Sequence, residues 1–517
     1  MPKKKDWFRP KTYPHIGLPI SYKDRGWVEN YVTCSENIAN HQFLPFIHKQ
    51  ISQRRFRKKI KRDGSRTKKR FKKIKPREIF YASHLDAQIY SYYADELRKK
   101  YEVILQDEGL ENTVTAYRRI PVEDDDIDRN KCNIDFAKEV FDFIKNFEAD
   151  KFCVLALDIE GFFDSLDHKI LRCKWYESLG KHTLPEDHYR IYRSLVNYSF
   201  VNEHQLFQEF KDEILVRGQN GKLRKKRVKK KKYLYDENAV AFCKKNQFVK
   251  RIKNKGFIKS RKYENYKKPN QKLRTKGIPQ GTPISDVLAN LYMTEFDSKM
   301  QTEASKTGGL YRRYSDDMVI VCHMEDRDRL EELACNFIKD KLELNIKSSK
   351  TQLFEFSRDR DTLSCREYIK KHDVWTEDTK FKYLGFSFDG EQVLLKSASI
   401  AKYYRKMKRS VKRAVHFAIY GKNADTTIFR KKLYKRFSYQ GAGRRRKYIR
   451  DKDDPTKWHK SHHYDWGNFL SYVYLAANIF DEPAIKKQLG NHWKILNDEI
   501  KKGEKKINEK LSEFSSK

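Results

Sequence analysis

Short apolar runs bounded by turn residues recur along the chain, and each predicts a β-strand or a hairpin. The run KFCVLALD (151–158) consists of strand-forming residues and ends on an acid. LYRRYSDDMVIVC (310–322) places two such runs around two adjacent carboxylates, which indicates a hairpin with acids at its tip. KYLGFSFDGEQVLL (382–395) predicts a second hairpin, with Asp389-Gly390 as its turn.

Longer segments with helical periodicity lie between these strands. From Arg77 the chain starts β-like and then becomes an amphipathic helix, whose apolar side chains include Leu85 and Ile89. The glycine-rich turn GIPQGTPIS (277–285) leads into another helix, and from about residue 397 the pattern is helical. This mixture predicts an α+β fold with a separate helical C-terminal domain.

Composition divides the chain further. Residues 203–275 are low in hydrophobic residues and dense in Lys and Arg, so we interpret them as a mobile basic flap inserted in the globular pattern. QRRFRKKIKRDGSRTKKRFKKIK (53–75) suits an arm that follows phosphates. The predicted parts are a basic N-terminal extension (1–75), two central parts (76–150 and 151–395) and the helical C-terminal part (396–517).

The charge of the chain predicts a nucleic-acid partner. Its 517 residues include 112 Lys and Arg against 71 Asp and Glu, a formal net charge of +41. That excess favours a polyanion, and an aromatic content of 14% favours stacking on unpaired bases. The candidate phosphate contacts in the basic flap are Lys225, Lys226, Arg227 and Lys229.

Other partners and compartments are disfavoured. No segment approaches the roughly 18 apolar residues of a membrane span, so we expect no membrane partner and a cytoplasmic location. The eight cysteines form no CxxC pair and no Cys/His cluster with zinc spacing, which predicts reduced thiols. Oligomer formation is compatible with the sequence.

The adjacent acids Asp316 and Asp317 raise the question of chemistry. Two like charges on one turn repel each other unless a cation lies beside them. Asp158, at the end of its own strand, is the natural third acid, and such oxygen ligands select Mg²⁺, with Mn²⁺ as the alternative. Two ions about 4 Å apart would support in-line nucleotidyl transfer, although a lone Asp-Asp pair is usually a solvated turn.

The order of the motifs carries a resemblance. DIEGFFDSLDH, GIPQGTPIS, YSDD, IKSSKTQ and YLGFSF follow one another as in the palm of reverse transcriptases, and the similarity covers roughly residues 77–395. It implies a right-hand polymerase with fingers and palm of the reverse transcriptase type, the basic insertion and an α-helical thumb. The implied metal-binding positions are Asp158, Ile159, Asp316 and Asp317.

The same resemblance assigns further positions. It implies that Lys350 protonates the leaving pyrophosphate and that Tyr383, Leu384 and Gly385 hold the primer end. Gln280 and Gly281 would approach the nucleotide, while Phe163, five residues after the first acid, would collide with a ribose 2′-OH and so favour dNTPs. Cations for the incoming triphosphate would come from Arg118, with Arg77 and Lys131 as the next candidates. Each of these three could instead contact template phosphates or be an ordinary surface charge.

The subclass is suggested by shorter motifs. YPHIGLPIS, YASHLDAQIYSYYA and NFLSYVYLAA resemble bacterial reverse transcriptases of the "unknown group", which are related to group II intron and retron enzymes and include antiphage-defence proteins. This implies an RNA-directed DNA polymerase in a bacterial cytoplasm. Its partners would be dNTPs, a DNA primer or product, and a noncoding RNA that serves as template or scaffold.

Three alternatives stay open at this point. The same site could perform weakly templated or template-independent DNA synthesis. The chain could be a group II intron-like maturase or RNA-binding protein with a vestigial palm, although the three acids are intact. It could also be an RNA-dependent RNA polymerase, which Phe163 disfavours.

Overall fold

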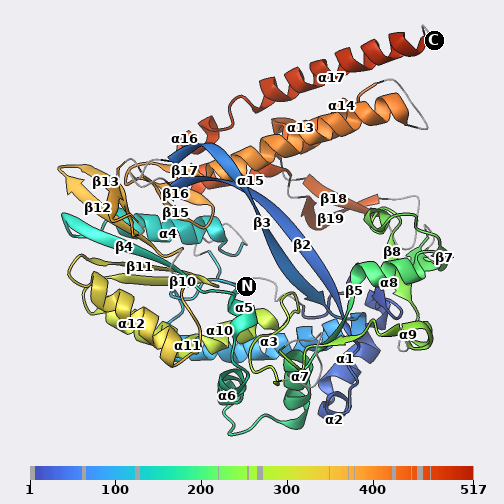
Figure 1. The fold of residues 1–517 in the computed structure, drawn as a ribbon, viewed down its shortest axis with the longest axis horizontal. Coiled ribbons are helices and arrows are strands. Elements are labelled where there is room, and N and C mark those ends of the chain that lie inside the picture. Colours follow the sequence, from blue (N-terminus) through green and yellow to red (C-terminus); the bar gives the residue numbers. More distant parts are fainter. Residues whose placement is uncertain are drawn as a thin grey trace. The chain divides into compact units, whose positions relative to one another are not determined.

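A computed structural model places most of the chain. It describes residues 6–60, 66–122, 129–218, 221–252, 255–264, 272–347, 350–370, 372–377, 379–421, 427–443, 445–450, 458–465 and 467–515. The chain forms two compact units, whose helices and strands are labelled in Figure 1. Unit 1 comprises Met1–Ile120, Cys153–Leu353 and Ile369–Val374, and unit 2 comprises Pro121–Phe152, Phe354–Tyr368 and Trp375–Lys517.

Unit 1 mixes helices with short strands. Before the first boundary its elements are β1 (His15–Ile16), α1 (Arg25–Thr33), α2 (Ser35–Ala39), β2 (Phe46–Ile60), β3 (Arg66–Tyr81) and α3 (His84–Asp107). After it come β4 (Lys151–Asp158), α5 (Phe162–Ser165), α6 (His168–Ser178), α7 (Glu186–Val196), β5 (Ser199–Asn202), α8 (Glu203–Phe210), β6 (Ile214–Arg217), β7 (Leu223–Lys226), β8 (Ala239–Cys243), α9 (Lys245–Ile252), β9 (Lys259–Ser260), α10 (Ser285–Tyr292), α11 (Thr294–Ser305), β10 (Leu310–Tyr314), β11 (Asp317–His323) and α12 (Arg327–Asp340).

The predicted hairpin over residues 310–322 is present. β10 and β11 pair antiparallel, and Tyr314 lies opposite Asp317, so Ser315 and Asp316 form a two-residue turn. In the sheet β11 lies between β10 and β4. The apolar runs of β4 and β11 are buried almost throughout, because a central strand is covered on both faces.

The segment 203–275 differs from the mobile basic flap that we expected. Its described residues form α8, β6, β7, β8, α9 and β9, and β6 and β8 belong to the four-stranded sheet β1-β8-β6-β7. A hydrophobic core built around Phe207, Phe210, Val216 and Phe242 holds these elements together. The prediction was wrong because a few large apolar residues, spaced among many lysines, are enough to bury one face of each short element.

The N-terminal residues are also integrated into unit 1. β1 pairs parallel with β8, and the long strands β2 and β3 pair antiparallel from Ile47–Tyr81 to Ile60–Arg66. β5 adds to β2 in parallel, which gives the sheet order β3-β2-β5-β9. Most of the basic side chains predicted for a phosphate-tracking arm in 53–75 lie outside the described residues.

Unit 2 is mainly helical, with small sheets. Its elements are α4 (Asn133–Lys145), β12 (Gln352–Asp359), β13 (Thr362–Ile369), β14 (Val374–Thr376), β15 (Phe381–Tyr383), β16 (Phe386–Phe388), β17 (Val393–Leu395), α13 (Ser397–Tyr420), α14 (Arg430–Phe437), β18 (Arg445–Arg450), β19 (Trp458–Asp465), α15 (Phe469–Ile479), α16 (Pro483–Lys487) and α17 (His492–Ser515). Unit boundaries fall within or next to β4, β12, β13 and β14. Residues after 396 are mainly helical but share unit 2 with residues 121–152 and 354–368, so the boundaries of the predicted C-terminal domain stay a prediction. The α+β class is confirmed.

The predicted hairpin at 382–395 is a three-stranded meander instead. β15 and β16 are joined through Leu384-Gly385, both in the left-handed region, and β16 and β17 through the Asp389-Gly390 turn. Asp389 Oδ1 accepts the N–H of Gln392 at 2.8 Å, which fixes the second turn. The first turn was missed because Leu rarely adopts a positive φ, here +40°.

Among the described residues, no helix combines the length and the apolar character that a bilayer requires.

Candidate active site

The acidic turn between β10 and β11 is held in an unusual conformation. Ser315 has φ +62°, a left-handed backbone that costs about 1 kcal/mol or more for a residue with a Cβ. Ser315 is buried, Asp316 is half-buried and Asp317 is exposed. The turn therefore presents Asp316 at its tip at the expense of local strain, which neighbouring residues must compensate.

A buried ion pair beneath the turn provides part of that compensation. Arg313 and Asp297 are both fully buried, and the guanidinium donates to the two carboxylate oxygens at 2.7 and 2.5 Å. It also donates to Asn290 Oδ1 at 3.1 Å and to the backbone carbonyl of Ser315 at 3.3 Å. Burial alone would lower the pKa of Arg313, but the carboxylate of Asp297 raises it above its usual range, so the guanidinium stays charged.

Tyr117 holds the turn from the other side. Its hydroxyl lies 3.0 Å from Ser315 Oγ, and burial raises the pKa of this phenol. The preceding segment pairs with β10, because Thr115 N donates to the carbonyl of Arg313 at 3.0 Å and Arg313 N donates to that of Thr113 at 2.9 Å. Helix α10, strand β10 and the 113–117 segment together fix the turn.

The first acid of the sequence analysis comes next to this turn through the backbone. Ile159 N donates to the carbonyl of Asp316 at 3.3 Å, and Lys347 N donates to the carbonyl of Asp158 at 2.8 Å. The end of β4, the acidic turn and the segment after α12 therefore meet at one place. The structure thus brings the backbones of Asp158, Ile159 and Asp316 together, while the roles predicted for these residues stay a prediction.

The carboxylate of Asp158 is buried, and only one of its two oxygens has a hydrogen-bond partner. Its Oδ2 accepts from the ammonium of Lys350, while Oδ1 is buried and has no hydrogen-bond partner. A buried carboxylate oxygen without a partner is costly, so it is suited to a cation. Lys350 therefore contacts the acid itself.

The three acids do not form a finished ligand set. Among the described residues, no group of three or more His, Cys, Asp or Glu side chains is close enough to hold a metal ion. The donor chemistry fits Mg²⁺, since all candidates offer hard oxygens and Asp158 Oδ1 lacks a partner. The backbones of these segments meet, but the carboxylates of Asp158, Asp316 and Asp317 do not form a group that could hold a metal ion.

The GIPQG turn packs against α5, which follows β4. Gly277 N donates to the carbonyl of Leu166 at 2.7 Å, and Ile278 N donates to that of Phe163 at 2.8 Å. A Cβ on Gly277, whose φ is +92°, would lie 2.6 Å from the carbonyl oxygen of Asp164, so only glycine fits. The first and second predicted motifs are thus in direct contact, and Phe163 of the first motif is half-buried.

The other end of this turn contacts β3. Phe80 N donates to the carbonyl of Gln280 at 2.9 Å, and a Cβ on Gly281 would lie 2.9 Å from the Phe80 carbonyl oxygen. Gln280 is half-buried, and Arg77 is an exposed residue of the same strand. The β2–β3 hairpin is therefore anchored to the predicted nucleotide-contacting turn.

Two of the predicted triphosphate contacts are engaged elsewhere. Arg118 is nearly buried and binds the carboxylate of Glu102 through Nε and Nη2, at 3.0 and 2.6 Å, as well as backbone carbonyls. Lys131, in unit 2, pairs with Glu139 at 2.8 Å. Arg118 therefore fixes the 113–117 segment that supports the acidic turn, a role that its position in the sequence did not reveal.

The predicted primer-grip residues lie in unit 2. Tyr383 is buried, and the Leu384-Gly385 turn is fixed by Asn133 Nδ2, which donates to the Leu384 carbonyl at 2.8 Å. Asn133 Nδ2 also donates to the hydroxyl of Tyr472 at 2.9 Å. The turn is thus tied to α4 and α15 of the same unit.

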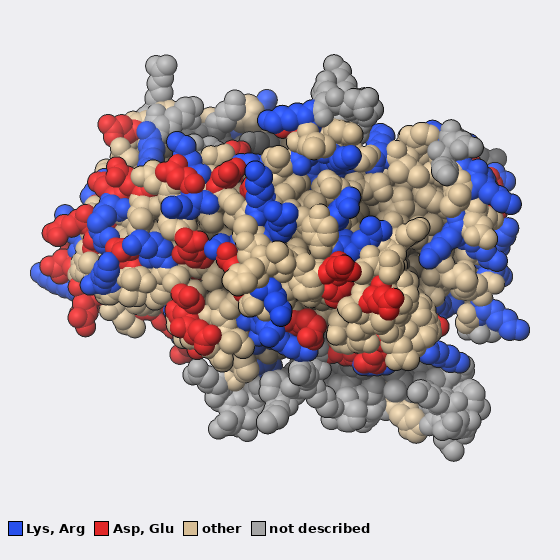
Figure 2. Space-filling model, turned by 90° about the horizontal axis from the view of Figure 1, so that it is seen from below, with Lys and Arg blue, Asp and Glu red and all other residues tan. Residues whose placement is uncertain are grey.

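The predicted phosphate-binding residues are partly neutralised. Lys225 pairs with Glu213 at 3.2 Å, Lys226 with Glu237 at 2.5 Å, and Arg227 with Asp212 at 2.8 Å. Lys229 is exposed. On the face drawn in Figure 2, Lys and Arg lie among Asp and Glu over much of the surface. Exposed ion pairs are worth about 0–1 kcal/mol each, so they do not prevent phosphate binding.

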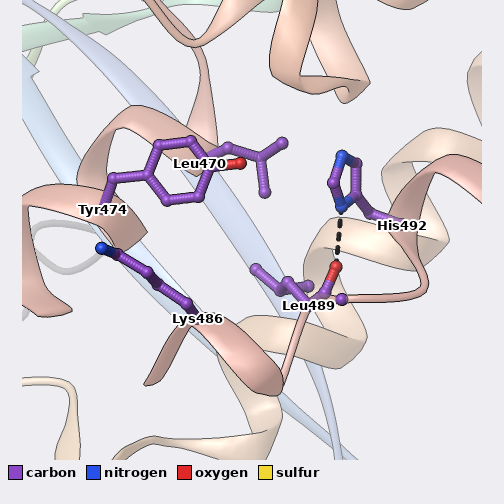
Figure 3. A pocket seen from close by; sticks show the side chains of 6 residues that line it. Leu470, Tyr474, Lys486, Leu489 and His492 are labelled. Carbon is purple, nitrogen blue, oxygen red and sulfur yellow. Dashed lines mark hydrogen bonds between the residues drawn. The ribbon is translucent and has the colours of Figure 1, made fainter. Parts of the chain in front are cut away.

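A pocket in unit 2 has different chemistry. It measures about 410 Å³ and is lined by Leu470, Tyr474, Lys486, Leu489, Gly490 and His492 (Figure 3). His492 Nδ1 lies 2.7 Å from the carbonyl oxygen of Leu489. The lining contains no carboxylate, so this pocket offers no set of acidic ligands for a catalytic metal.

Comparison with known proteins supports one family. The sequence model of a family described as "Reverse transcriptase (RNA-dependent DNA polymerase)" matches residues 231–388. That match identifies a reverse transcriptase domain with its type of fold, and it supports the enzyme class, RNA-directed DNA polymerase. No curated protein matches the sequence.

Solved structures of telomerase show a distant likeness. Apo telomerase from Candida tropicalis, truncated from the C-terminal domain, is 10% identical, with a TM-score of 0.36 over 73% of this chain and 61% of that chain. Telomerase from Candida albicans in complex with the TWJ fragment of telomeric RNA is 13% identical, with a TM-score of 0.36 over 91% and 58%. The chain spans about three fifths of the length of these telomerase chains.

Proposed function

Starting from the reverse transcriptase domain in residues 231–388, we propose that this chain synthesises DNA on an RNA template by two-metal nucleotidyl transfer. The observation that carries the proposal is the meeting of β4 with the acidic turn, where Ile159 N donates to the Asp316 carbonyl and a buried oxygen of Asp158 lacks a partner. Those features suit a cation-dependent site for a developing negative charge.

The residues present would divide the work as follows. Asp158 Oδ1 and the Asp316 carboxylate would hold Mg²⁺, with Asp317 and the Ile159 carbonyl as further oxygens. When bound, the metal supplies charge stabilisation for the attacking and leaving oxygens. Lys350, already next to Asp158, donates a proton to the leaving pyrophosphate. Phe163 and the Gly277–Gly281 turn shape the space for the deoxyribose.

We also propose a biological setting. The motifs at 13–21, 81–94 and 468–477 support a bacterial, defence-associated reverse transcriptase that acts in the cytoplasm with a noncoding RNA as template or scaffold. The net charge of +41 supports an RNA partner.

The test starts from the protein as isolated from cells. Sequencing the RNA that co-purifies with it, and then adding single dNTPs with Mg²⁺, would reveal template and product. The proposal predicts dNTP incorporation complementary to the bound RNA. Incorporation that ignores the RNA sequence would favour the template-independent alternative, and faster use of rNTPs would favour an RNA polymerase.

A further inference from the structure

Helix α13 in unit 2 carries a continuous basic face. It contains seven Lys or Arg and no Asp or Glu. All seven are exposed, and six of them share one face of the helix: Lys402, Arg405, Lys406, Arg409, Lys412 and Arg413. Within the part of the chain that the structure describes, none of these six forms an ion pair, whereas Lys408 pairs with Glu499. This surface therefore differs from the run at 225–229, where acids accompany the cations.

The same face ends in aromatic side chains. Phe417 and Tyr420 are 62% and 59% exposed, which is unusual for side chains that gain by burial. His416 directly precedes Phe417, and its ring lies 5.0 Å from that of Tyr420 and 6.2 Å from that of Phe417. At about 100° per residue, the six cations and these three rings fall within an arc of about 140°.

The opposite face of α13 is fixed by packing. Tyr403, Met407, Val411 and Ala418 are buried, and α17 runs alongside the helix (Figure 1). Gly503 of α17 allows close approach, because a Cβ there would lie 2.6 Å from Val415 Cγ2. The basic and aromatic side chains thus project from a rigid helix, over about 27 Å from Lys402 to Tyr420.

Charge and rings together define the ligand. A row of cations tracks a phosphate backbone, and exposed aromatic rings stack on bases that have no pairing partner. A duplex keeps its bases stacked inside and would leave the rings unused. During reverse transcription the DNA product is paired with its template, so the unpaired strand is RNA.

We propose that the exposed face of α13 binds single-stranded RNA, with Phe417 and Tyr420 stacking on unpaired bases and Arg409, Lys412 and Arg413 contacting phosphates. The choice of RNA rests on the proposed function; the ligand chemistry rests on the helix alone. The face adds a binding site to the one implied by the reverse transcriptase domain.

The test is a binding titration of the full chain by fluorescence anisotropy. The probes are an RNA–DNA duplex with a 15-nucleotide 5′ overhang of oligo(U) RNA, the same duplex with an oligo(dT) overhang on the DNA strand, and the blunt duplex. The variants are Phe417→Ala/Tyr420→Ala, Arg409→Gln/Lys412→Gln/Arg413→Gln and, as the matched control, Tyr235→Ala, whose ring is 89% exposed in unit 1.

The aromatic variant should bind the RNA-overhang probe about 10- to 100-fold more weakly and the blunt duplex unchanged. The charge variant should lower the slope of log affinity against log salt on that probe by about 2. Tyr235→Ala should match the wild type. Unchanged affinity of the aromatic variant, an equal loss on blunt duplex, or a loss confined to the DNA overhang would each overturn the proposal. Repeating the titration with Asp158→Asn/Asp316→Asn separates it from catalysis, because that variant should bind the overhang normally even if the polymerase proposal fails.

Discussion

Removing one partner of the buried Arg313–Asp297 pair should damage both stability and catalysis. Arg313→Met leaves the Asp297 carboxylate uncompensated, which costs about 3–5 kcal/mol, and it removes the donors to Asn290 Oδ1 and the Ser315 carbonyl, about 1 kcal/mol each. For a unit of this size, 1 kcal/mol corresponds to roughly 2–4 °C in Tm. The combined cost of about 5–7 kcal/mol should therefore lower the Tm by roughly 10–28 °C.

The activity effect can be separated from the stability effect. Well below the Tm of the variant, Arg313→Met should lower kcat by about 100-fold with little change in KM for dNTP, because the turn that carries Asp316 loses its support. Arg313→Met/Asp297→Leu, which replaces the pair with apolar groups, should recover most of the stability and not kcat.

The assays are thermal unfolding followed by circular dichroism and steady-state extension of a DNA primer on an RNA template. The stabilising role of the buried pair is refuted if Arg313→Met unfolds within about 2 °C of the wild type. It is equally refuted if the double variant loses as much stability as the two single changes combined, since the cost would then not come from an unpaired buried charge.

Three further predictions follow from separate contacts. Phe163→Ala should raise the efficiency of rNTP use relative to dNTP use by about 10-fold or more in competition assays. An unchanged ratio would show that Phe163 does not exclude the ribose 2′-OH. Gly277→Ala should destabilise the protein by about 1–3 kcal/mol in urea unfolding, because its Cβ would meet the Asp164 carbonyl, whereas Gly26→Ala, in open space, should not. His15 is buried, and burial lowers its pKa to about 4. As the pH falls, the unfolded chain therefore protonates His15 at a higher pH than the folded chain does. The free energy of unfolding should fall by roughly 3 kcal/mol as the pH drops from about 6.5 to 4, and His15→Gln should flatten that slope.

The sequence was informative where the pattern is local. The β4 run, the β10–β11 hairpin and the helices after residue 396 follow from short-range periodicity, and the order of motifs predicted that the end of β4 lies next to the acidic turn, which their backbone contact fits. The supporting residues were harder to find because their partners are remote in the sequence, as with Asp297 and Arg313 or Tyr117 and Ser315. The sequence contains one sign of the Arg313–Asp297 pair. Arg313 shares a face of the predicted core strand with Tyr311, and an Arg buried on such a face needs an acidic partner.

One prediction failed, and one predicted substrate contact is engaged elsewhere, each for a physical reason. The density of Lys and Arg in 203–275 hid the spacing of Phe207, Phe210 and Phe242, which form a core despite the charge around them. Arg118 was predicted to be a substrate contact on its type and position, but the carboxylate of Glu102 takes its guanidinium. Side-chain pairing of this kind depends on the packing of α3 against the following loop, which no local pattern encodes.

The central claim is that Asp158 and Asp316 serve one metal-dependent polymerase site. Single-turnover extension of a DNA primer annealed to RNA, with Mg²⁺ and dNTPs, measures it directly in the wild type and in Asp158→Asn and Asp316→Asn. We predict that each variant loses at least about a thousandfold in rate while its affinity for the primer–template changes little. Extension by either variant at close to the wild-type rate would contradict the claim.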